Sequence, residues 1–478
     1  MPNYRLSSLV FSCSLFSGLL CLIPAAAHAA QPLPPVVAEA LSRSAIPLQS
    51  VGAYVQEVSS PKPTVAWNAE AGFNPASTMK LVTTDAALEM LGPAFVWKTR
   101  AYLRGTLSDG VLQGDLIIRG EGDPKLVTER FWQFLRQIRA AGVREIRGNL
   151  ILDRSQFATT AYDAGAFDGS PLKPYNVGPD ALLLNYNVVT MRFMPDAVRG
   201  VATVQFDPPV AWTQTRMPNL TNGACGDWQG NLQPQFQPDG VRFSGGYPAS
   251  CGEKIWYIHP YRLNPNDYFG QVFRQLWRDV GGSFSGNVVD GTTPPDARQI
   301  VEWQSPSLPE IVRDINKFSN NVMARHLLLT IAAQHGNVPA TPQFGVNLVR
   351  AWLNRKGIDT DKLVIENGSG LSRTEQITPE EMGRMLVAAY QSPVMAEFIA
   401  SMPIVGLDGT MRRRLVNDDV AGRAHIKTGS LDGVRSVAGY VQAISGRRYA
   451  VVCIINDSRA EAGRAAQDAF LQWVYENG

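Results

Sequence analysis

The sequence contains few metal-binding side chains and carries little net charge. Its 478 residues include five cysteines and five histidines, and no C-x-x-C pair or zinc-type histidine spacing occurs. The formal net charge is +2, which argues against a nucleic-acid-binding surface. The G-x-S-x-G segment that surrounds the nucleophile of α/β-hydrolases is also missing. We therefore expect no metal and no cofactor, and we expect any serine nucleophile to use another base.

Long apolar runs are missing everywhere except at the N-terminus. Arg5 precedes the run LVFSCSLFSGLLCLIP, and AAAHAA follows it, which is the pattern of a secretory signal peptide. We expect residues 1–29 to be removed after Ala29 and the mature protein to be periplasmic; an uncleaved anchor is the alternative. Because no later run is long enough to span a bilayer and the chain ends in WVYENG, we expect no stable membrane anchor.

Three cysteines remain after the expected cleavage, and export permits disulfides. Cys225 and Cys251 lie in polar, glycine-rich segments and form the natural pair. Cys453 lies in the apolar strand pattern YAVVCIIN and is expected to be a buried free thiol.

The middle of the chain, residues 98–295, differs in pattern from both ends. TRAYLRGTL and VLQGDLIIRG flank the turn SDG, and a helix and a further strand follow, which predicts a parallel strand–helix–strand unit. Residues 196–255 are rich in Pro, Gly, Asn and Gln, with short strand patterns. We expect this region to be an insertion of two nested subdomains, one α/β and one β.

The flanking parts, 30–97 and 296–478, are expected to build one α/β (α+β) domain. A helix begins near Ser77 and ends at Gly92–Pro93. Further helices are predicted for SLPEIVRDINKF, NNVMARHLLLTIAAQHG and TPEEMGRMLVAAYQ, the last with Thr378 as its N-cap. RAHIKTGSL, VRSVAGYVQAI and YAVVCIIN predict three strands, followed by a final helix.

A serine and a lysine three residues apart open the first of these helices. Such S-x-x-K segments occur three times, at Ser59/Lys62, Ser170/Lys173 and Ser77/Lys80. Prolines spoil a helix at the first two, whereas Ser77 and Lys80 share one helical face. Taken alone, the pair is more simply a helix start; as a catalytic pair it supplies a nucleophile and its base.

Lysine accepts a proton only when its pKa is lowered, which burial or a second cation achieves. Lys427 in HIKTGSLDG is the candidate second cation, on a strand where Gly429 shares its face. Gly429 would let substrate backbone lie close, and the hydroxyls of Thr428 and Ser430 could hold a carboxylate. A polar strand edge is the simpler alternative.

KFSNNVMA adds Ser319 and Asn321 at the break between two predicted helices. Both residues also suit a helix cap, which is the alternative reading. The other S-x-N, Ser285/Asn287, has the pattern of a strand entry.

In chain order, S-x-x-K, S-x-N and K-T-G resemble the motif set of penicillin-binding proteins, although the second motif reads S-N-N rather than S-D-N. GDLIIRGEGDPKL, GNLILDRSQF, ENGSGLSR and GLDGTMRRRL extend the resemblance to the class C low-molecular-mass D-alanyl-D-alanine carboxypeptidase/endopeptidases. It implies a β-lactamase/transpeptidase-like domain, with an antiparallel sheet flanked by helices and an all-helical lobe, interrupted by smaller inserted domains.

The resemblance also implies roles for the residues of the three motifs. Ser77 would attack the penultimate D-alanine carbonyl of a peptidoglycan stem peptide, and Lys80 would take its proton. Ser319, held with Asn321 and Lys427, would pass a proton to the leaving amine.

The remaining roles concern substrate binding. The N–H groups of Ser77 and Ser430 would form the oxyanion hole, and Thr428, Gly429 and Ser430 would bind the substrate's terminus. By looser analogy, Asp168 could meet the amine of a diaminopimelate side chain.

The predicted function is a periplasmic serine DD-carboxypeptidase and DD-endopeptidase that β-lactams inhibit covalently. Its substrates would be peptidoglycan peptides ending in D-Ala-D-Ala and cross-linked stems. A β-lactamase is one rival, although no E-x-x-x-N loop follows Ser319 soon enough to activate a hydrolytic water. A non-catalytic peptidoglycan-binding protein with a decayed site is the other.

Overall fold

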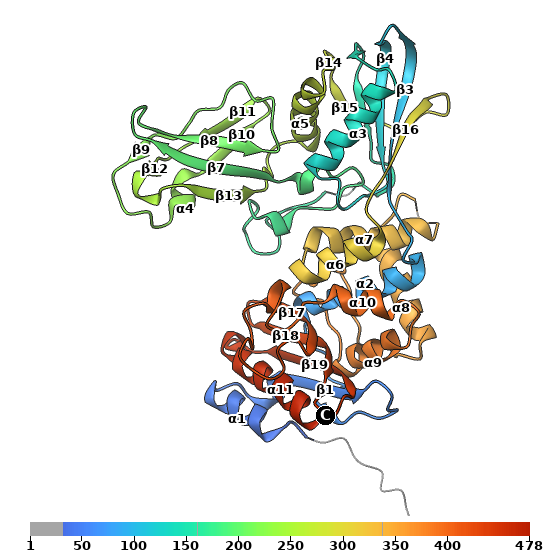
Figure 1. The fold of residues 1–478 in the computed structure, drawn as a ribbon, viewed down its shortest axis with the longest axis vertical. Helices are drawn as coiled ribbons and strands as arrows, with labels where there is room; N and C mark the ends of the chain where they lie inside the picture. The colour runs from blue at the N-terminus through green and yellow to red at the C-terminus, as the bar shows by residue number, and fades with distance from the viewer. Residues whose placement is uncertain (1–31, 160, 337) are drawn as a thin grey trace, which may run out of the picture.

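The computed structural model describes residues 32–159, 161–336 and 338–478. The expected signal peptide lies outside this range. The chain forms two stacked bodies (Figure 1). Residues 32–97 and 305–478 form one of them, called the lower body here after its place in the figure. Residues 98–304, called the insertion, form the other. Within the described residues, no helix is both long and apolar enough to cross a bilayer.

The lower body is built on one five-stranded antiparallel sheet, as predicted. The strand order is β17 (Ala424–Leu431), β18 (Val434–Gln442), β19 (Arg448–Asn456), β1 (Val51–Glu57) and β2 (Val65–Trp67). Strand β1 pairs with β19, so strands from the N-terminal and C-terminal parts of the described chain meet within one sheet. The strand β17 ends the sheet on the side away from β2.

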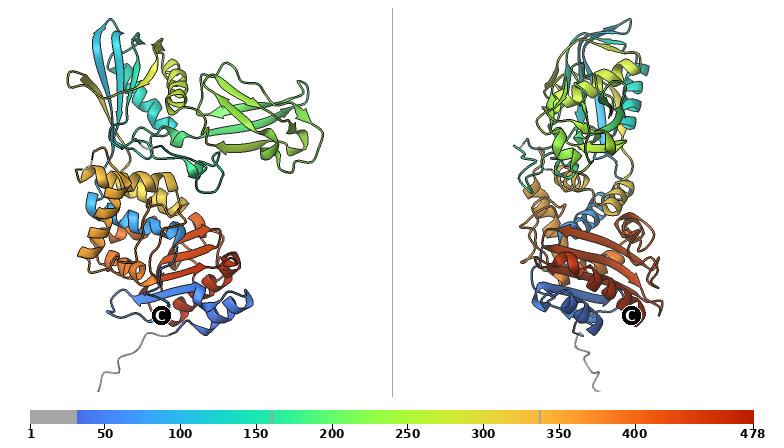
Figure 2. Two further views of the ribbon diagram at one scale, coloured as in Figure 1. Left: turned by 180° about the vertical axis from the view of Figure 1, so that it is seen from behind. Right: turned by 90° about the vertical axis from the view of Figure 1, so that its left-hand side faces the viewer.

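Both faces of this sheet are covered. Side chains alternate along β1: Ala53 and Val55 pack toward α1 (Pro35–Arg43) and α11 (Arg464–Asn477), whereas Tyr54 packs toward the other helices. The sheet thus lies between a layer formed by α1 and α11 and a layer formed by the other helices (Figure 2). The sheet is therefore buried on both faces, which explains its near-continuous apolar strands.

The helical lobe surrounds α2 (Met79–Leu91), in which every side chain from Met79 to Leu88 is buried. It contains α6 (Leu308–Phe318), α7 (Asn321–Gln334), α8 (Pro342–Arg355), α9 (Pro379–Tyr390) and α10 (Met395–Ser401). Ser77 itself lies in the 3₁₀ turn η2 (Ala76–Thr78), which leads into α2. The predicted helix thus exists and ends at Gly92, and it begins with a tighter turn.

The first part of the insertion is a mixed sheet covered by α3 (Thr128–Ala140) and α5 (Pro265–Asp279). Its strands are β3 (Lys98–Ser108), β4 (Val111–Gly120), β5 (Glu145–Ile146), β6 (Leu150–Asp153), β14 (Ser283–Phe284), β15 (Val288–Asp290) and β16 (Arg298–Gln304). The predicted parallel unit is confirmed, because β4 and β6 pair in parallel across α3. Strand β16 pairs with β3, so this sheet continues to Gln304.

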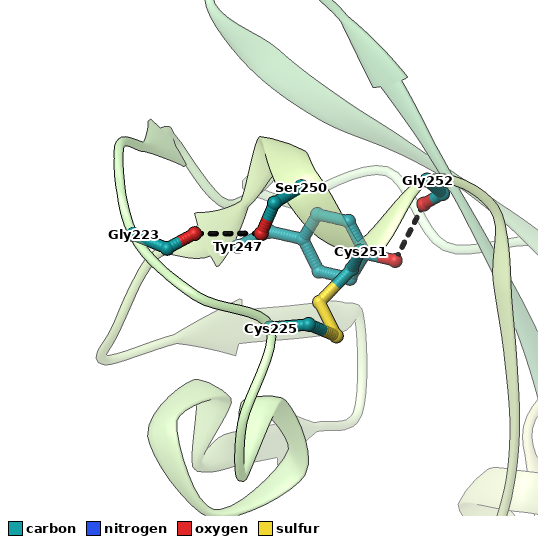
Figure 3. Close-up of a disulfide and its surroundings, with 6 residues drawn as sticks. All are labelled: Gly223, Cys225, Tyr247, Ser250, Cys251 and Gly252. Atoms are coloured by element: carbon teal, nitrogen blue, oxygen red, sulfur yellow. Dashed lines mark hydrogen bonds between the residues drawn. A yellow bond between two sulfur atoms is a disulfide. The ribbon is translucent and has the colours of Figure 1, made fainter.

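The second part of the insertion is the predicted β structure with long loops. It contains β7 (Val189–Asp196), β8 (Val201–Asp207), β9 (Leu220–Thr221), β10 (Pro234–Gln237), β11 (Gly240–Phe243), β12 (Tyr247–Pro248), β13 (Lys254–Ile258) and the short helix α4 (Trp228–Leu232). A disulfide joins Cys225 to Cys251 beside Tyr247 (Figure 3). Cys453, in contrast, is a buried free thiol in β19.

Short 3₁₀ turns complete the chain. They are η1 (Leu48–Ser50), η3 (Pro174–Asn176), η4 (Asn185–Asn187), η5 (Ala249–Cys251), η6 (Gly409–Met411) and η7 (Ala460–Gly463). Of these, η6 lies against β17 at the edge of the sheet.

Candidate active site

The turn η2 presents the Ser77 hydroxyl between the sheet and the helical lobe. Ala76 adopts φ +46°, and Thr78 Oγ1 donates to the Pro75 carbonyl at 2.8 Å. Ser436 Oγ of β18 donates to the same carbonyl at 2.6 Å, which ties the turn to the sheet. Ser77 is half-buried at the start of α2, where the helix dipole favours negative charge.

Lys80 lies one turn further on and is completely buried. Its Nζ is 2.9 Å from Ser77 Oγ and 2.6 Å from Asn321 Oδ1, and it also contacts the Ser369 carbonyl oxygen. A neutral amine has two N–H groups and one lone pair. A neutral Lys80 that donates these two N–H groups to Asn321 and Ser369 would keep its lone pair for the Ser77 hydroxyl, whereas a charged Lys80 would donate to all three oxygens.

The surroundings favour this neutral amine. Burial, first, and then the positive charge of Lys427 hold the pKa of Lys80 well below its usual value. Arg325 acts in the same direction and Glu375 opposes it. The second lysine expected from the sequence is therefore close enough to act on the first.

Ser319 lies at the break between α6 and α7 in the left-handed conformation, with φ +58°. Lys427 Nζ donates to Ser319 Oγ at 2.9 Å and to the Thr428 carbonyl at 2.7 Å. Burial lowers the pKa of Lys427 to about 7. The N-cap of α7 is Asn320, whose side chain accepts from the Met323 N–H at 3.1 Å. Helix capping therefore leaves the Ser319 hydroxyl to contact Lys427.

Strand β17 forms the wall opposite α2, and Lys427 and Gly429 share its inner face. A Cβ at Gly429 would lie 2.6 Å from the Pro75 carbonyl oxygen and 2.9 Å from the Ser77 nitrogen. The missing side chain thus lets the strand approach the turn that carries Ser77. This close contact explains the glycine more directly than the expected room for substrate does. Thr428 Oγ1 donates to Thr410 Oγ1 at 2.8 Å, and Ser430 is exposed.

The other candidate segments do not join this site. Ser59 donates to Glu57, and the Lys173 N–H donates to the Ser170 carbonyl in an exposed turn. Asp168 accepts hydrogen bonds from Ser170, Tyr175 and Asn176 within its own segment.

One neighbouring contact does connect the insertion with the site. The Arg373 guanidinium lies 4.9 Å from the centre of the Phe167 ring. Asp168 follows that ring in the chain, which brings its segment near the loop of the lower body that carries Ser369.

Sequence reasoning missed the contribution of the Ser369 carbonyl and of Glu375. ENGSGLSR marked this loop only through its resemblance, because a backbone carbonyl has no side-chain signature. Glu375 is 1% exposed, and nothing local in the sequence indicates that a glutamate is buried there. Among the described residues, no three His, Cys, Asp or Glu side chains gather to hold a metal.

The fold and the Ser–Lys pair define a class C low-molecular-mass penicillin-binding protein, a serine enzyme with a transpeptidase-like domain. The chain belongs to the D-Ala-D-Ala carboxypeptidase 3 (S13) family, whose sequence pattern matches residues 35–477. The protein is therefore a serine-type D-Ala-D-Ala carboxypeptidase.

Relatives and solved structures support this assignment. D-alanyl-D-alanine carboxypeptidase DacB of Haemophilus influenzae is 27% identical over 80% of each chain. D-alanyl-D-alanine carboxypeptidase of Actinomadura sp. is 28% identical over 83% of this chain and 75% of its own. The crystal structure of penicillin-binding protein 4 of H. influenzae has a TM-score of 0.77 at 22% identity, over 92% of this chain and 99% of that one. That protein has also been solved in complex with a β-lactam.

Proposed function

We propose that this protein cleaves the terminal D-Ala-D-Ala bond of peptidoglycan stem peptides through an acyl-enzyme on Ser77. The observation that carries the proposal is the completely buried Lys80 amine, whose Nζ lies 2.9 Å from Ser77 Oγ. Since both N–H groups have carbonyl-type acceptors, Asn321 and Ser369, the amine is oriented as a general base.

In the acylation step, Lys80 takes the Ser77 proton as Oγ attacks the carbonyl of the penultimate D-alanine. The oxyanion that develops is stabilised by the N–H groups of Ser77 and Ser430. Support for this pair comes from the packing of Gly429 against the Ser77 nitrogen, which sets β17 beside η2.

Breaking the peptide bond requires a proton on the leaving amine. Ser319 donates it and is re-supplied through Lys427, which contacts its hydroxyl. A lysine whose pKa is about 7 exchanges protons readily at neutral pH. Asn321 orients the substrate amide, and Thr428 and Ser430 bind the terminal carboxylate. The proton that Lys80 took from Ser77 then restores Lys427. Water attacks the acyl-enzyme and gives a proton to Lys80, which passes it to Ser77 Oγ as the shortened peptide leaves.

The same chemistry extends to cross-linked stems. In a DD-endopeptidase reaction, the leaving amine belongs to a second stem peptide instead of free D-alanine. The carbonyl that Ser77 attacks is that of a D-alanine in both reactions. Penicillins acylate Ser77 by the same route and remain attached.

We also propose the division of the chain. Residues 1–29 are a signal peptide for export to the periplasm, and the transpeptidase-like domain comprises 30–97 and 305–478. For the insertion we propose residues 98–304 instead of the expected 98–295, and the pairing of β16 with β3 supports the later boundary. The disulfide supports an oxidising compartment.

Mass spectrometry of the purified protein mixed with benzylpenicillin tests the proposal. One adduct is expected, on the peptide that contains Ser77, and Ser77→Ala should form none. Digestion of cross-linked muropeptides should release D-alanine and monomers. An adduct that persists in Ser77→Ala contradicts the mechanism, and an adduct that turns over rapidly favours the β-lactamase alternative.

A further inference from the structure

The ends of the loop of residues 364–376 are joined by two backbone hydrogen bonds, and the loop contacts Lys80 through the Ser369 carbonyl. The Val364 N–H donates to the Gln376 carbonyl at 2.8 Å, and the Gln376 N–H donates back at 2.9 Å. The chain between these ends has no regular secondary structure, so its shape depends on internal contacts.

One carboxylate oxygen of Glu375 accepts hydrogen bonds from several backbone N–H groups of that loop. Glu375 Oε1 accepts from three consecutive backbone N–H groups, those of Glu366, Asn367 and Gly368, at 3.1, 3.0 and 3.1 Å. The second oxygen, Oε2, is buried and has no hydrogen-bond partner among the described residues. Burying a carboxylate is costly unless hydrogen bonds or an opposite charge compensate it, and the three N–H groups do so only at Oε1.

The loop of residues 364–376 contacts the catalytic helix at several points. Gly368 offers its carbonyl to Thr83 Oγ1 at 2.7 Å, and the Ser369 carbonyl accepts from Lys80. A Cβ at Gly370 would lie 1.9 Å from the Ala76 carbonyl oxygen, so the loop is pressed against the turn η2. A shift of the loop would therefore move the carbonyl that orients the Lys80 lone pair.

We propose that Glu375 is a positioning residue for Lys80. Its carboxylate holds together the loop that presents the Ser369 carbonyl, and its buried charge opposes the loss of the lysine's proton. This inference rests on the proposed role of Lys80 as the base for Ser77.

The charges that act on Lys80 come from three other elements. Lys427 on β17 and Arg325 on α7 lower its pKa, as burial does, whereas Glu375 raises it. Removal of the Glu375 charge should therefore lower the pKa of Lys80 further. The neutral amine would then persist to lower pH, and the acidic limb of the acylation rate would move to lower pH.

Glu375→Gln separates charge from shape, because its amide oxygen can still accept from the loop N–H groups. The second-order rate constant of acylation by a chromogenic penicillin is measured from pH 5 to pH 9. We expect the acidic limb to move down by about one pH unit. Glu366→Gln, which removes an exposed carboxylate of the same loop, is the matched control and should leave the limb in place.

Glu375→Ala removes both effects and is expected to lower the acylation rate at the optimum about tenfold or more, beyond any shift of the limb. Thermal unfolding of each variant shows whether it is folded. If Glu375→Gln titrates like the wild type and Glu366→Gln, the inference is wrong. If the wild type forms no Ser77 adduct, the proposed function fails instead.

Discussion

The lower body buries more ionisable side chains than the insertion does, among them lysines. In the lower body, buried ionisable side chains include Lys80, Asp85, Lys317, Glu375 and Lys427. Among the described residues of the insertion, the buried charged side chains are Asp123 and Asp153, and no lysine is buried.

Compensation differs between Asp153 of the insertion and the two lysines of the lower body, although Asp123 of the insertion resembles the lysines because burial raises its pKa to about 6. In the insertion, Asp153 Oδ2 accepts from the Thr293 N–H and Oγ1 at 2.7 and 2.6 Å, and these bonds hold its pKa below the usual value. In the lower body, burial shifts the pKa of Lys80 and Lys427 toward the neutral form. If Lys80 acts as the proposed base, the unfavourable burial at the site serves its chemistry and costs stability.

The largest expected effect compares the two S-x-x-K lysines that lie in different bodies. Lys80→Met should lower the rate of penicillin acylation about 10³-fold, because the general base is lost. Lys173→Met, in an exposed turn of the insertion, should acylate like the wild type. The measurement is the second-order rate constant with a reporter penicillin. Near-normal acylation of Lys80→Met would show that Lys80 is not the general base, and that its S-x-x-K segment is no more catalytic than that of Lys173.

The second test destabilises the insertion alone. Replacing Cys225 and Cys251 by serine removes a cross-link between residues separated by 26 positions, which should cost about 3 kcal/mol. Hydrogen exchange should quicken in β7 and β13 but not in β18 and β19. Because the site lies in the lower body, penicillin should acylate Ser77 at the same rate. A parallel loss of acylation would show that the bodies do not behave independently.

The third test uses pH, since Lys80 and Lys427 release protons on folding. Burial lowers the pKa of Lys427 from 10.5 to about 7, so between these values the unfolded chain binds more protons. Lys427 alone should therefore raise stability with pH, by at most about 2 kcal/mol from pH 7 to pH 8.5. Lys80 acts in the same direction, and Cys453, whose pKa is raised by burial to about 12, opposes it only near pH 9 and above.

Urea unfolding of the wild type at both pH values measures this rise. Lys427→Met should lose part of it, whereas Lys173→Met should keep all of it. An equal rise in both variants would indicate that the buried lysine does not cause it.

Local sequence patterns were enough to predict the Ser–Lys pair and the sheet of the lower body. The spacing of Ser77 and Lys80 is local, and helix geometry alone places both on one side of a turn. The need for a neutral amine then predicted a second cation, and the structure brings Lys427 near. Strand patterns gave the sheet of the lower body because alternating or continuous apolar runs are local signals.

Contacts made by backbone atoms and across long chain separations were not predictable. The Ser369 carbonyl that contacts Lys80 is 289 positions away in sequence and belongs to an irregular loop. The positive φ of Ala76 and the burial of Glu375 follow from packing against distant elements. Neither could be predicted from the usual preferences of alanine and glutamate. The pairing of β16 with β3 was missed for the same reason.

The smallest expected effect compares helix caps, which are local features in both bodies. Thr378 and Glu381 form a buried capping box at α9, with reciprocal bonds to each other's N–H groups at 3.0 and 2.6 Å. Asn264 caps α5 in the insertion through a single exposed contact. Thr378→Ala should cost about 1 to 2 kcal/mol and Asn264→Ala about 0.5 to 1 kcal/mol, measured by urea unfolding. The difference should arise because loss of the Thr378 hydroxyl leaves a buried N–H group without a partner, whereas water replaces the Asn264 side chain. Equal costs at the two caps would mean that burial does not strengthen this local interaction.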